Sequence, residues 1–447
     1  MGMNTALSYA YYVFNPFNFL YIIPVDEMII AALIYILKTG LSAFFFQKFV
    51  SKVFKCEGIE SIVFSLFYAL CSFNVLYNVI YAMWADALYM LPLICYLIYV
   101  LQKEGKWKSL ALAYTYLFIV HFYMAYIVGI FSFVVWLILW IAYANKQERK
   151  GMLLKYISSV LLAVGNSAFI WLPTLYFLVK NNMQKATEFS ELQANFLDII
   201  YNLSWGQMQG ADGIYPYIYC GIPTIFLIVL FFFNKKIKRK DKICVAVLGA
   251  FLMAGMMYMP LYKFMHAFDF PNMYGFRFVF LFCFLLTAVA CKQSVYLKET
   301  SRTFFLGTVI GCFVVYALLF FMQAKVEFEN ETSLALLIIG NFSLMFLWLI
   351  VYFAGILKSN NSTLTVVCII ILCMIEIVSN GLACNTVLGA ENSERHYSCY
   401  KQSIETGVAM LEEESFYRTL YYNDYVYNSD SWFDYKGISD FNSATNV

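Results

Sequence analysis

Long apolar runs separated by short polar breaks dominate this chain of 447 residues. Runs of roughly 18–22 apolar residues are long enough to cross a bilayer core of about 30 Å, and only helices satisfy their own backbone hydrogen bonds in lipid. The pattern therefore predicts an all-α polytopic membrane protein with about 12 transmembrane helices. We place them at residues 28–46, 59–73, 86–101, 109–120, 124–143, 153–179, 218–233, 243–262, 276–291, 303–323, 333–357 and 363–383.

Polar flanks divide the chain into three parts. Residues 1–27 form an external segment, residues 28–383 a transmembrane helical domain, and residues 384–447 the start of an extracytoplasmic, mainly-β domain. The last part is Tyr-rich, and "FYRTLYYNDYVYNSDSWFDYKG" alternates as strands do. It stops at "SATNV" without a terminating element, so we expect this domain to be truncated. We also expect one or more upstream helices to be missing, because residues 1–27 contain no Lys or Arg.

Lysine and arginine are concentrated in every second predicted loop. One set of loops, with "KFVSKVFK", "KEGKWK", "KQERKGMLLK" and "KKIKRKDK" among them, holds 20 of the 30 cationic residues, and the opposite set holds five. Cationic loops stay in the cytoplasm. The asymmetry predicts that both termini of this chain are extracytoplasmic.

Composition agrees with this class of protein. The chain is 62% hydrophobic and 20% aromatic, well above the roughly 45–50% apolar content of soluble domains. The net charge of +2 is spread over loops, so nothing indicates a nucleic-acid partner. Most of the twelve cysteines lie inside apolar runs, where we interpret them as small hydrophobes rather than as a disulfide framework.

Unusual polar residues gather at the predicted outer rim of the bundle. Asp26 precedes the first span, Asp86 opens the third one just after Trp84, and His121 lies beside Tyr123 at a helix break. Two of them also have ordinary interpretations: Asp86 as a helix N-cap or first-turn residue, and His121 as a hydrogen-bonded interfacial residue. The convergence of polar groups on one face predicts a binding site there.

Lys38 falls ten residues into the first span, near the middle of the bilayer. A lysine there costs roughly 2.5–3.5 kcal/mol on insertion scales, so it usually faces the protein interior and has a partner. Glu376 in the last span is a possible partner, and snorkelling of Lys38 to the inner edge is the alternative.

Arg277 lies at the outer end of its helix, where the positive-inside bias disfavours a cation. Arginine is always charged and binds phosphate with two parallel hydrogen bonds. A plain surface pair with Asp269 or His266 is the alternative. We predict that Arg277, with His266 and Asp269 nearby, binds a lipid phosphate at headgroup level.

Several segments, taken in order, resemble the bacterial YfhO family. They are "AYYVFNPFNFL", "MWADALYMLPLICYLIYVLQKEGKW", "HFYMAYIVGIF", "YIYCGIPTIFLIVLFFF", "HAFDFPNMYGFRFVFLFCFLLTA" and the terminal "FYR…YKGISDFNSATNV". The resemblance implies a GT-C-type membrane glycosyltransferase of the bacterial plasma membrane. Such an enzyme takes sugar from an undecaprenyl-phosphate donor and adds it to a cell-envelope glycopolymer acceptor, such as a teichoic acid, outside the cell.

In this reaction a carboxylate deprotonates the acceptor hydroxyl while cations or hydrogen-bond donors hold the leaving lipid phosphate. No cofactor is expected, and the sequence offers no compact cluster of metal ligands. Tyr123, Tyr215 and Tyr219 are candidates for stacking on sugar rings, and the interfacial aromatic belt is the alternative for each.

The chain departs from the family pattern at both ends. Family members begin with a transmembrane helix and an external loop whose aspartate is the expected general base, and this loop is absent here. The catalytic residue is therefore unknown, with Asp26 and Asp86 as candidates. Two functions from other classes stay open: a flippase for lipid-linked sugars, which Lys38 suits, and a noncatalytic envelope-assembly protein.

Overall fold

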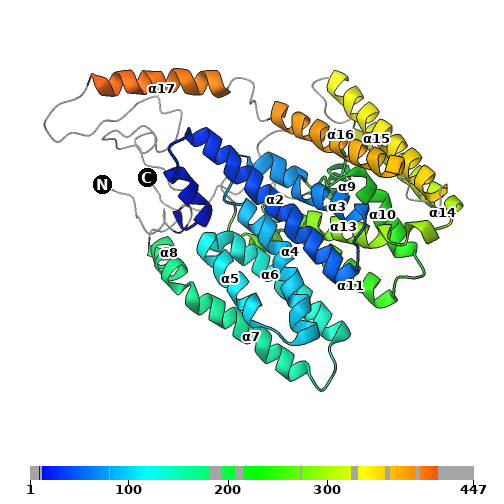
Figure 1. Ribbon diagram of the computed structural model, residues 1–447, viewed down its shortest axis with the longest axis horizontal. Helices are drawn as coiled ribbons and strands as arrows, with labels where there is room; N and C mark the ends of the chain where they lie inside the picture. The colour runs from blue at the N-terminus through cyan, green and yellow to red at the C-terminus, as the bar shows by residue number, and fades with distance from the viewer. Residues whose placement is uncertain are drawn as a thin grey trace.

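The computed structural model is all-helical over the residues that it describes (Figure 1). These are residue 10 and residues 13–79, 81–180, 194–206, 215–271, 274–323, 331–357, 363–387 and 393–410. Its α-helices are α2 Glu27–Phe54, α3 Ile59–Ala69, α4 Ala85–Glu104, α5 Lys108–Val120, α6 Phe122–Tyr143, α7 Arg149–Asn166, α8 Ala168–Lys180, α9 Phe196–Tyr201, α10 Ile222–Phe233, α11 Arg239–Met257, α12 Met259–Met265, α13 Val279–Ser294, α14 Arg302–Gln323, α15 Glu331–Leu357, α16 Thr363–Val387 and α17 Ser393–Ala409. Three short helical turns accompany them: η2 Pro16–Ile22, η3 Asn74–Asn78 and η4 Leu297–Glu299.

Each of the twelve predicted segments coincides with one of these helices or with a bent pair of helices. Within the described residues, six helices are long and apolar enough to cross a membrane, or up to eight if each bent pair is one span. The helices α3, α5, α10 and α13 are apolar but shorter. The protein is therefore a multi-pass helical membrane protein, and the figure of twelve spans stays a prediction.

Two segments predicted as continuous spans are broken. The helices α7 and α8 meet at 68° around Ser167, whose hydroxyl donates to the carbonyl of Ala163 at 2.8 Å. The helices α11 and α12 meet at 100° at Tyr258, and Pro260 follows in the first turn of α12. A side chain that bonds to the preceding turn and a proline that starts a new helix both interrupt helical hydrogen bonding. Apolar composition alone conceals such breaks.

The helix predicted from residue 218 begins only at Ile222. Gly221 precedes it with a φ angle of 95°, and a β-carbon at this position would lie 2.7 Å from the ring of Phe67. Glycine alone accepts both the left-handed backbone and the close approach. Residues 217–221 are thereby kept out of the helix and packed against α3.

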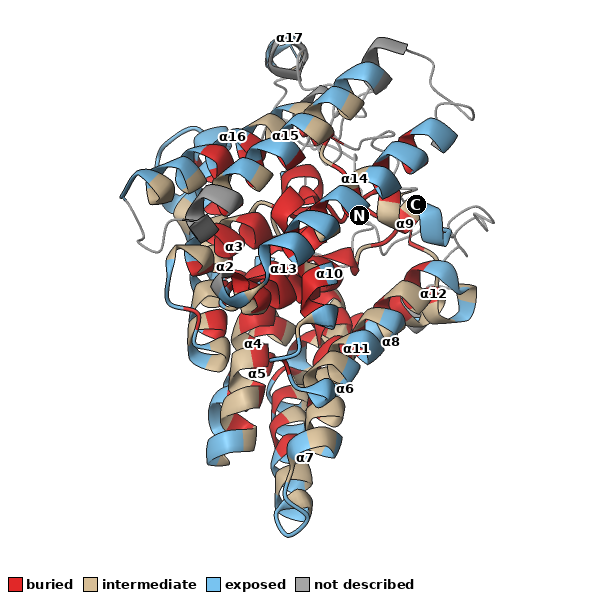
Figure 2. Cartoon of the chain, turned by 90° about the vertical axis from the view of Figure 1, so that its right-hand side faces the viewer, coloured by how far each residue is buried: buried red, intermediate tan, exposed pale blue. Residues whose placement is uncertain are grey.

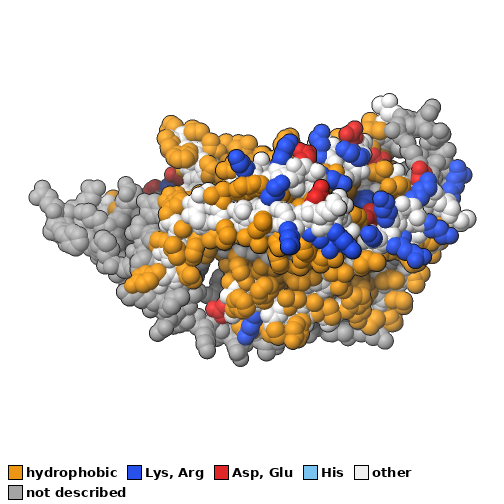
Figure 3. All heavy atoms as spheres, turned by 90° about the horizontal axis from the view of Figure 1, so that it is seen from below, with side chains coloured by type: hydrophobic (Ala, Val, Ile, Leu, Met, Phe, Trp, Pro, Cys, Tyr) orange, Lys and Arg blue, Asp and Glu red, His pale blue; other side chains and the backbone are white. Residues whose placement is uncertain are grey.

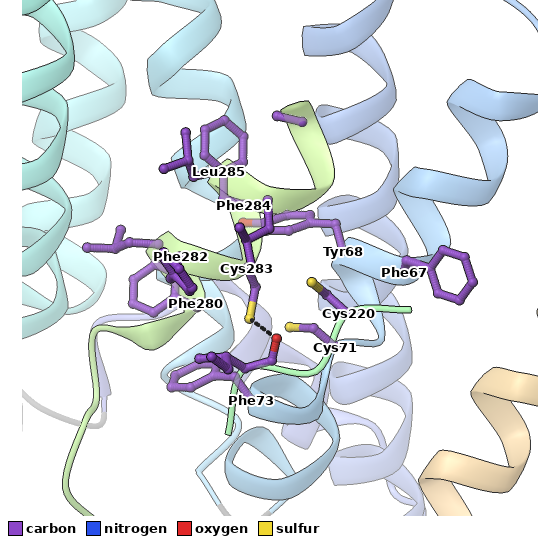
Figure 4. Close-up of a cluster of buried hydrophobic side chains, with 14 of the residues drawn as sticks. Phe67, Tyr68, Cys71, Phe73, Cys220, Phe280, Phe282, Cys283, Phe284 and Leu285 are labelled. Carbon is purple, nitrogen blue, oxygen red and sulfur yellow. Dashed lines mark hydrogen bonds between the residues drawn. The ribbon is translucent and has the colours of Figure 1, made fainter. Parts of the chain in front are cut away.

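The core lies around α13, in which every residue except Lys292 is buried (Figure 2). It packs against α3 and α10, and also contacts α2. Figure 4 shows part of this core, where Cys283 of α13 lies among Phe rings beside Cys71 and Cys220. The Cys283 thiol donates to the carbonyl of Ile218 at 3.6 Å. These cysteines fill space between apolar side chains, as predicted, and all twelve thiols are free.

Three of the predicted cytoplasmic loops, those after α6, α10 and α13, contact one another at one end of the bundle. Asp241 at the start of α11 accepts hydrogen bonds from Tyr143 at the end of α6 and from Lys292 of α13. Lys236 pairs with Glu299 in the same region. Figure 3 shows Lys and Arg side chains gathered over one half of the face seen from below. This grouping agrees with the alternation of charge, and which side of the membrane it faces remains the prediction of the positive-inside rule.

The helices α15 and α16 attach to the rest of the bundle through polar contacts. The amide nitrogen and the carbonyl of Trp205 are both bonded by the Asn341 side chain, at 2.8 and 2.9 Å. The Trp205 indole also donates to Ser379 of α16 at 3.0 Å. Its ring lies against Gly340, where a β-carbon would be 2.4 Å from the indole. The segment after α9 is therefore held against α15 by direction-specific bonds.

The carboxyl-terminal part differs from the expectation where it is described. Residues 393–409 form helix α17 instead of strands. The Tyr-rich segment that carries the strand-like alternation falls after residue 410, outside the described residues. The predicted mainly-β domain therefore stays a prediction for that segment only.

Candidate functional site

Lys38 lies inside the bundle and is paired, as predicted. Its ammonium is 2.7 Å from a carboxylate oxygen of Asp86 and donates to the carbonyl of Ala82 at 3.0 Å. The side chains of Lys38 and Asp86 are 3% and 0% exposed. The partner suggested from the sequence, Glu376, was wrong: Asp86 in the first turn of α4 occupies that role, and snorkelling is excluded by the burial of Lys38. Both charged groups are removed from water, so each would destabilise the fold if its partner were absent.

Further hydrogen bonds complete the surroundings of Asp86. Asn15 donates to Oδ2 at 2.7 Å, and the Tyr89 hydroxyl donates to Oδ1 at 2.7 Å. Tyr89 in turn lies 2.7 Å from the hydroxyl of Tyr116 on α5. Both oxygens of the carboxylate are therefore occupied, and the pair joins α2, α4, α5 and the segment before η2.

The segment before α2 closes over this ion pair. Asn15 is buried, and its side-chain oxygen accepts a bond from the amide of Phe17 at the start of η2. The Lys38 ammonium lies 5.5 Å from the centre of the Phe17 ring. The "NPFN" stretch thus has a defined position on the candidate site.

Asp26 lies apart from these groups and has a structural role. It precedes α2, and its side chain accepts a hydrogen bond from the amide of Met28 at 2.9 Å. This is the ordinary geometry of a helix N-cap, which satisfies one of the unpaired amides of the first turn.

Arg277 lies among aromatic side chains directly before the central helix α13. Its guanidinium carbon is 5.1 Å from the ring of Trp84 and 5.5 Å from that of Tyr123, and its Nε donates to the carbonyl of Tyr274 at 3.2 Å. Trp84 precedes Asp86 by two residues, so the start of α4 links Arg277 with the Lys38–Asp86 pair. Contacts of a cation with aromatic faces hold the guanidinium in place, each worth about 0.5–2 kcal/mol.

An aromatic wall surrounds the Arg277 end of the bundle. The ring of Tyr77 lies 5.8 Å from Tyr217, 5.5 Å from Tyr274 and 6.0 Å from Trp84. The rings of Tyr81 and Trp84 are stacked at 4.7 Å. Rings at such spacings stabilise one another, and Tyr77, Tyr217 and Trp84 are themselves buried. No single one of these tyrosines could be recognised in the sequence, because the chain contains 36 of them.

His121 connects the two charged groups. It ends α5 and begins α6, as the sequence predicted, and its Nδ1 accepts a bond from the amide of Met124 at 3.3 Å. Burial lowers the pKa of His121, and the positive charges of Lys38 and Arg277 lower it further. Both effects favour the neutral form of His121.

The segment from residue 266 to Arg277 has an unusual backbone. Four of its non-glycine residues have φ angles between 46° and 68°: Ala267, Phe268, Tyr274 and Phe276. Left-handed conformations of bulky residues cost energy, and they persist where the surrounding structure imposes them, often near functional sites. Asp269 accepts a bond from the next amide, Phe270, at 2.8 Å.

Tyr219 and Glu376 form a separate buried cluster. Glu376 accepts hydrogen bonds from the Tyr219 hydroxyl, from the indole of Trp348, and from the amide of Ile222 at 2.6 Å. Tyr219 is 4% exposed and its hydroxyl is directed to this carboxylate. The cluster joins α10, α15 and α16, away from the aromatic wall.

Within the described part of the chain, no group of three or more His, Cys, Asp or Glu side chains could hold a metal ion. The arrangement that remains is a ring of aromatic residues around one arginine, next to a buried Lys–Asp pair. All of it lies opposite the cationic loops.

The fold and this placement of charge define a multi-pass integral membrane protein with a polar site at one end of its helical bundle. The chain belongs to the family of the bacterial membrane protein YfhO, whose model matches residues 1–447. No curated protein and no solved structure matches the chain.

Proposed function

We propose that this protein is a membrane glycosyltransferase that uses a polyprenyl-phosphate-linked sugar to glycosylate a cell-envelope polymer on the outer face of the membrane. The observation that carries the proposal is the position of Arg277 beside Trp84 and Tyr123, at the end of the bundle opposite the cationic loops. A polyprenyl-phosphate donor presents its phosphate at the level of the headgroups, next to apolar chains that remain in the bilayer.

The chemistry requires a cation at this place. The bond between the anomeric carbon and the phosphate oxygen breaks, a new bond forms to the acceptor hydroxyl, and the lipid phosphate leaves with one more negative charge. Arg277 stabilises this developing charge, and the positive N-terminal end of α13 adds to its effect. Tyr81 and Tyr274, the partly exposed rings of the aromatic wall, support the sugar ring by stacking.

The Lys38–Asp86 pair has a supporting role in this proposal. Asp86 is occupied by Lys38, Asn15 and Tyr89, so we assign it to positioning the start of α4, and with it Trp84, rather than to proton removal. Asp26 caps α2, and we assign it no catalytic role. The proton of the acceptor hydroxyl passes to a carboxylate that we do not assign among the described residues.

The test uses the full chain in proteoliposomes with a short-chain polyprenyl-phosphate glucose and purified teichoic acid. We expect labelled acceptor, and Arg277→Ala should lower its formation at least tenfold because a charged hydrogen-bonding partner of phosphate is lost. Arg149→Ala is the matched control, since Arg149 also lies over a tryptophan, 5.4 Å from Trp140, at the opposite end. Equal loss in both variants would contradict the assignment of Arg277.

A flippase for lipid-linked sugars is the second candidate, because a buried ion pair within the bundle is typical of transport proteins as well. The same vesicles separate the two functions. Movement of a fluorescent sugar lipid across the bilayer without labelling of the acceptor supports the flippase. Vesicles that show neither activity favour the noncatalytic envelope-assembly role.

A further inference from the structure

His266 carries a buried hydrogen-bond acceptor that nothing in the described part of the chain satisfies. The side chain is 3% exposed, and its Nδ1 lies 2.9 Å from the carbonyl of Tyr262. A carbonyl accepts and cannot donate, so Nδ1 carries the proton and Nε2 presents a lone pair. Nε2 has no hydrogen-bond partner among the described residues. Leaving a buried polar atom in this state is costly, so it demands an explanation.

The surroundings fix this ring in one orientation. It lies 4.3 Å from the ring of Tyr262 and 5.4 Å from that of Phe278, the residue after Arg277. Tyr262 also receives a hydrogen bond from the amide of Phe276, the residue before Arg277. The two residues that flank Arg277 therefore pack around the same Tyr262–His266 unit, and this packing couples the position of the imidazole to that of the arginine.

The surroundings also favour the neutral form of the ring. Burial lowers the pKa of His266, and the positive charge of Arg277 lowers it further. A neutral imidazole with a fixed tautomer is an acceptor for O–H or N–H groups, and it does not bind phosphate, which offers acceptors only.

We infer that Nε2 of His266 accepts a hydrogen bond from a hydroxyl of the donor sugar, whose phosphate Arg277 holds. This inference rests on the proposed function. It adds a hydrogen bond that recognises the sugar, whereas Arg277 binds the lipid phosphate. A site built to accept a hydroxyl discriminates strongly against ligands that lack it, because its own polar group is otherwise left unpaired.

The backbone directly after His266 forms an exposed turn. Ala267 and Phe268 follow it with φ angles of 59° and 68°, and Phe268 is 72% exposed. The amide of Phe268 bonds to the carbonyl of Lys263 at 2.7 Å. Because His266 is buried, a sugar hydroxyl reaches Nε2 only if a neighbouring segment moves, and this exposed turn is the segment that we propose to move.

The experiment compares binding of farnesyl phosphate with binding of farnesyl phosphates that carry glucose, galactose or N-acetylglucosamine, using the full chain in nanodiscs. Three variants distinguish the role of Nδ1 from that of Nε2. His266→Asn retains a donor for the Tyr262 carbonyl and lacks the outer acceptor, His266→Gln places a carbonyl near the position of Nε2, and His266→Phe retains only the ring. His396→Asn, in α17, is the control.

Wild type and His396→Asn should bind at least one sugar-bearing ligand more tightly than farnesyl phosphate. We expect that advantage to fall about tenfold in the Asn and Phe variants, with affinity for farnesyl phosphate unchanged, and to be retained in the Gln variant. An unchanged advantage in the Asn and Phe variants overturns the role of His266 and leaves the proposed function standing. If wild type binds none of these lipids, the proposed function itself is wrong, and this inference with it.

Discussion

Replacement of Lys38 by methionine should destabilise the protein markedly, because Asp86 would remain buried without its counter-ion. The two side chains are 3% and 0% exposed, so solvent screening does not reduce the effect. Removing one partner of a buried pair typically costs about 3–5 kcal/mol. Asn15 and Tyr89 still bond to Asp86 in the variant, which places the expected loss near the lower value, about 3 kcal/mol.

The double variant Lys38→Met/Asp86→Asn separates charge from packing. The asparagine retains an acceptor for Tyr89 and removes the uncompensated charge, so the double variant should be more stable than either single variant. The pairwise term in this double-mutant cycle should exceed about 1 kcal/mol.

The assay is thermal unfolding of the purified protein in one detergent, together with the yield of monodisperse protein. Lys48→Met is the matched control, since Lys48 belongs to the same helix but is exposed. A Lys38→Met variant as stable as this control, or strictly additive losses in the double variant, would show that the pair does not contribute as described.

Two further substitutions address the attachment of α15 and α16. Glu376→Gln should lower stability by about 1–3 kcal/mol in the same unfolding assay, because its amide group must face at least one of the donors that the carboxylate accepts. Wild-type stability of this variant would mean that the cluster is not formed. Gly340→Ala should cost about 1–3 kcal/mol, because its methyl group displaces the Trp205 indole, whereas Gly311→Ala, with no atom within 4 Å of the new carbon, should not. Equal unfolding temperatures for these two variants would contradict the packing of Trp205.

The helices were largely predictable because lipid imposes one strong rule on composition. Apolar runs located all twelve predicted segments, whereas the short α9 and the polar α17 were not predicted. The helix break at His121 was found because polar residues interrupt such a run. The bends at Ser167 and Tyr258 were missed because hydrophobicity continues through them. They depend on a side-chain hydrogen bond and on a proline in the next turn.

The candidate site was predictable in part for the same reason. A charge in an apolar run is conspicuous, so Lys38, Arg277 and Glu376 could be singled out from the sequence. Their partners could not, because sequence spacing contains no distance between helices, and Lys38 was matched with the wrong carboxylate. Asn15 and Tyr89 complete the surroundings of Asp86. No sequence pattern distinguishes them from the other polar and aromatic residues of the chain.

The way in which Asn341 holds the main chain of Trp205 has a consequence for assembly. Lipid tails are as apolar as the surface of a transmembrane helix. Two helices in a bilayer therefore gain little free energy from burying apolar side chains against each other instead of against lipid. A paired amide contact, by contrast, is satisfied in one alignment and lost after a small slide or rotation. The register of α15 is therefore set in part by the main chain of Trp205, so that a slide of this helix along its neighbours would break both bonds at once.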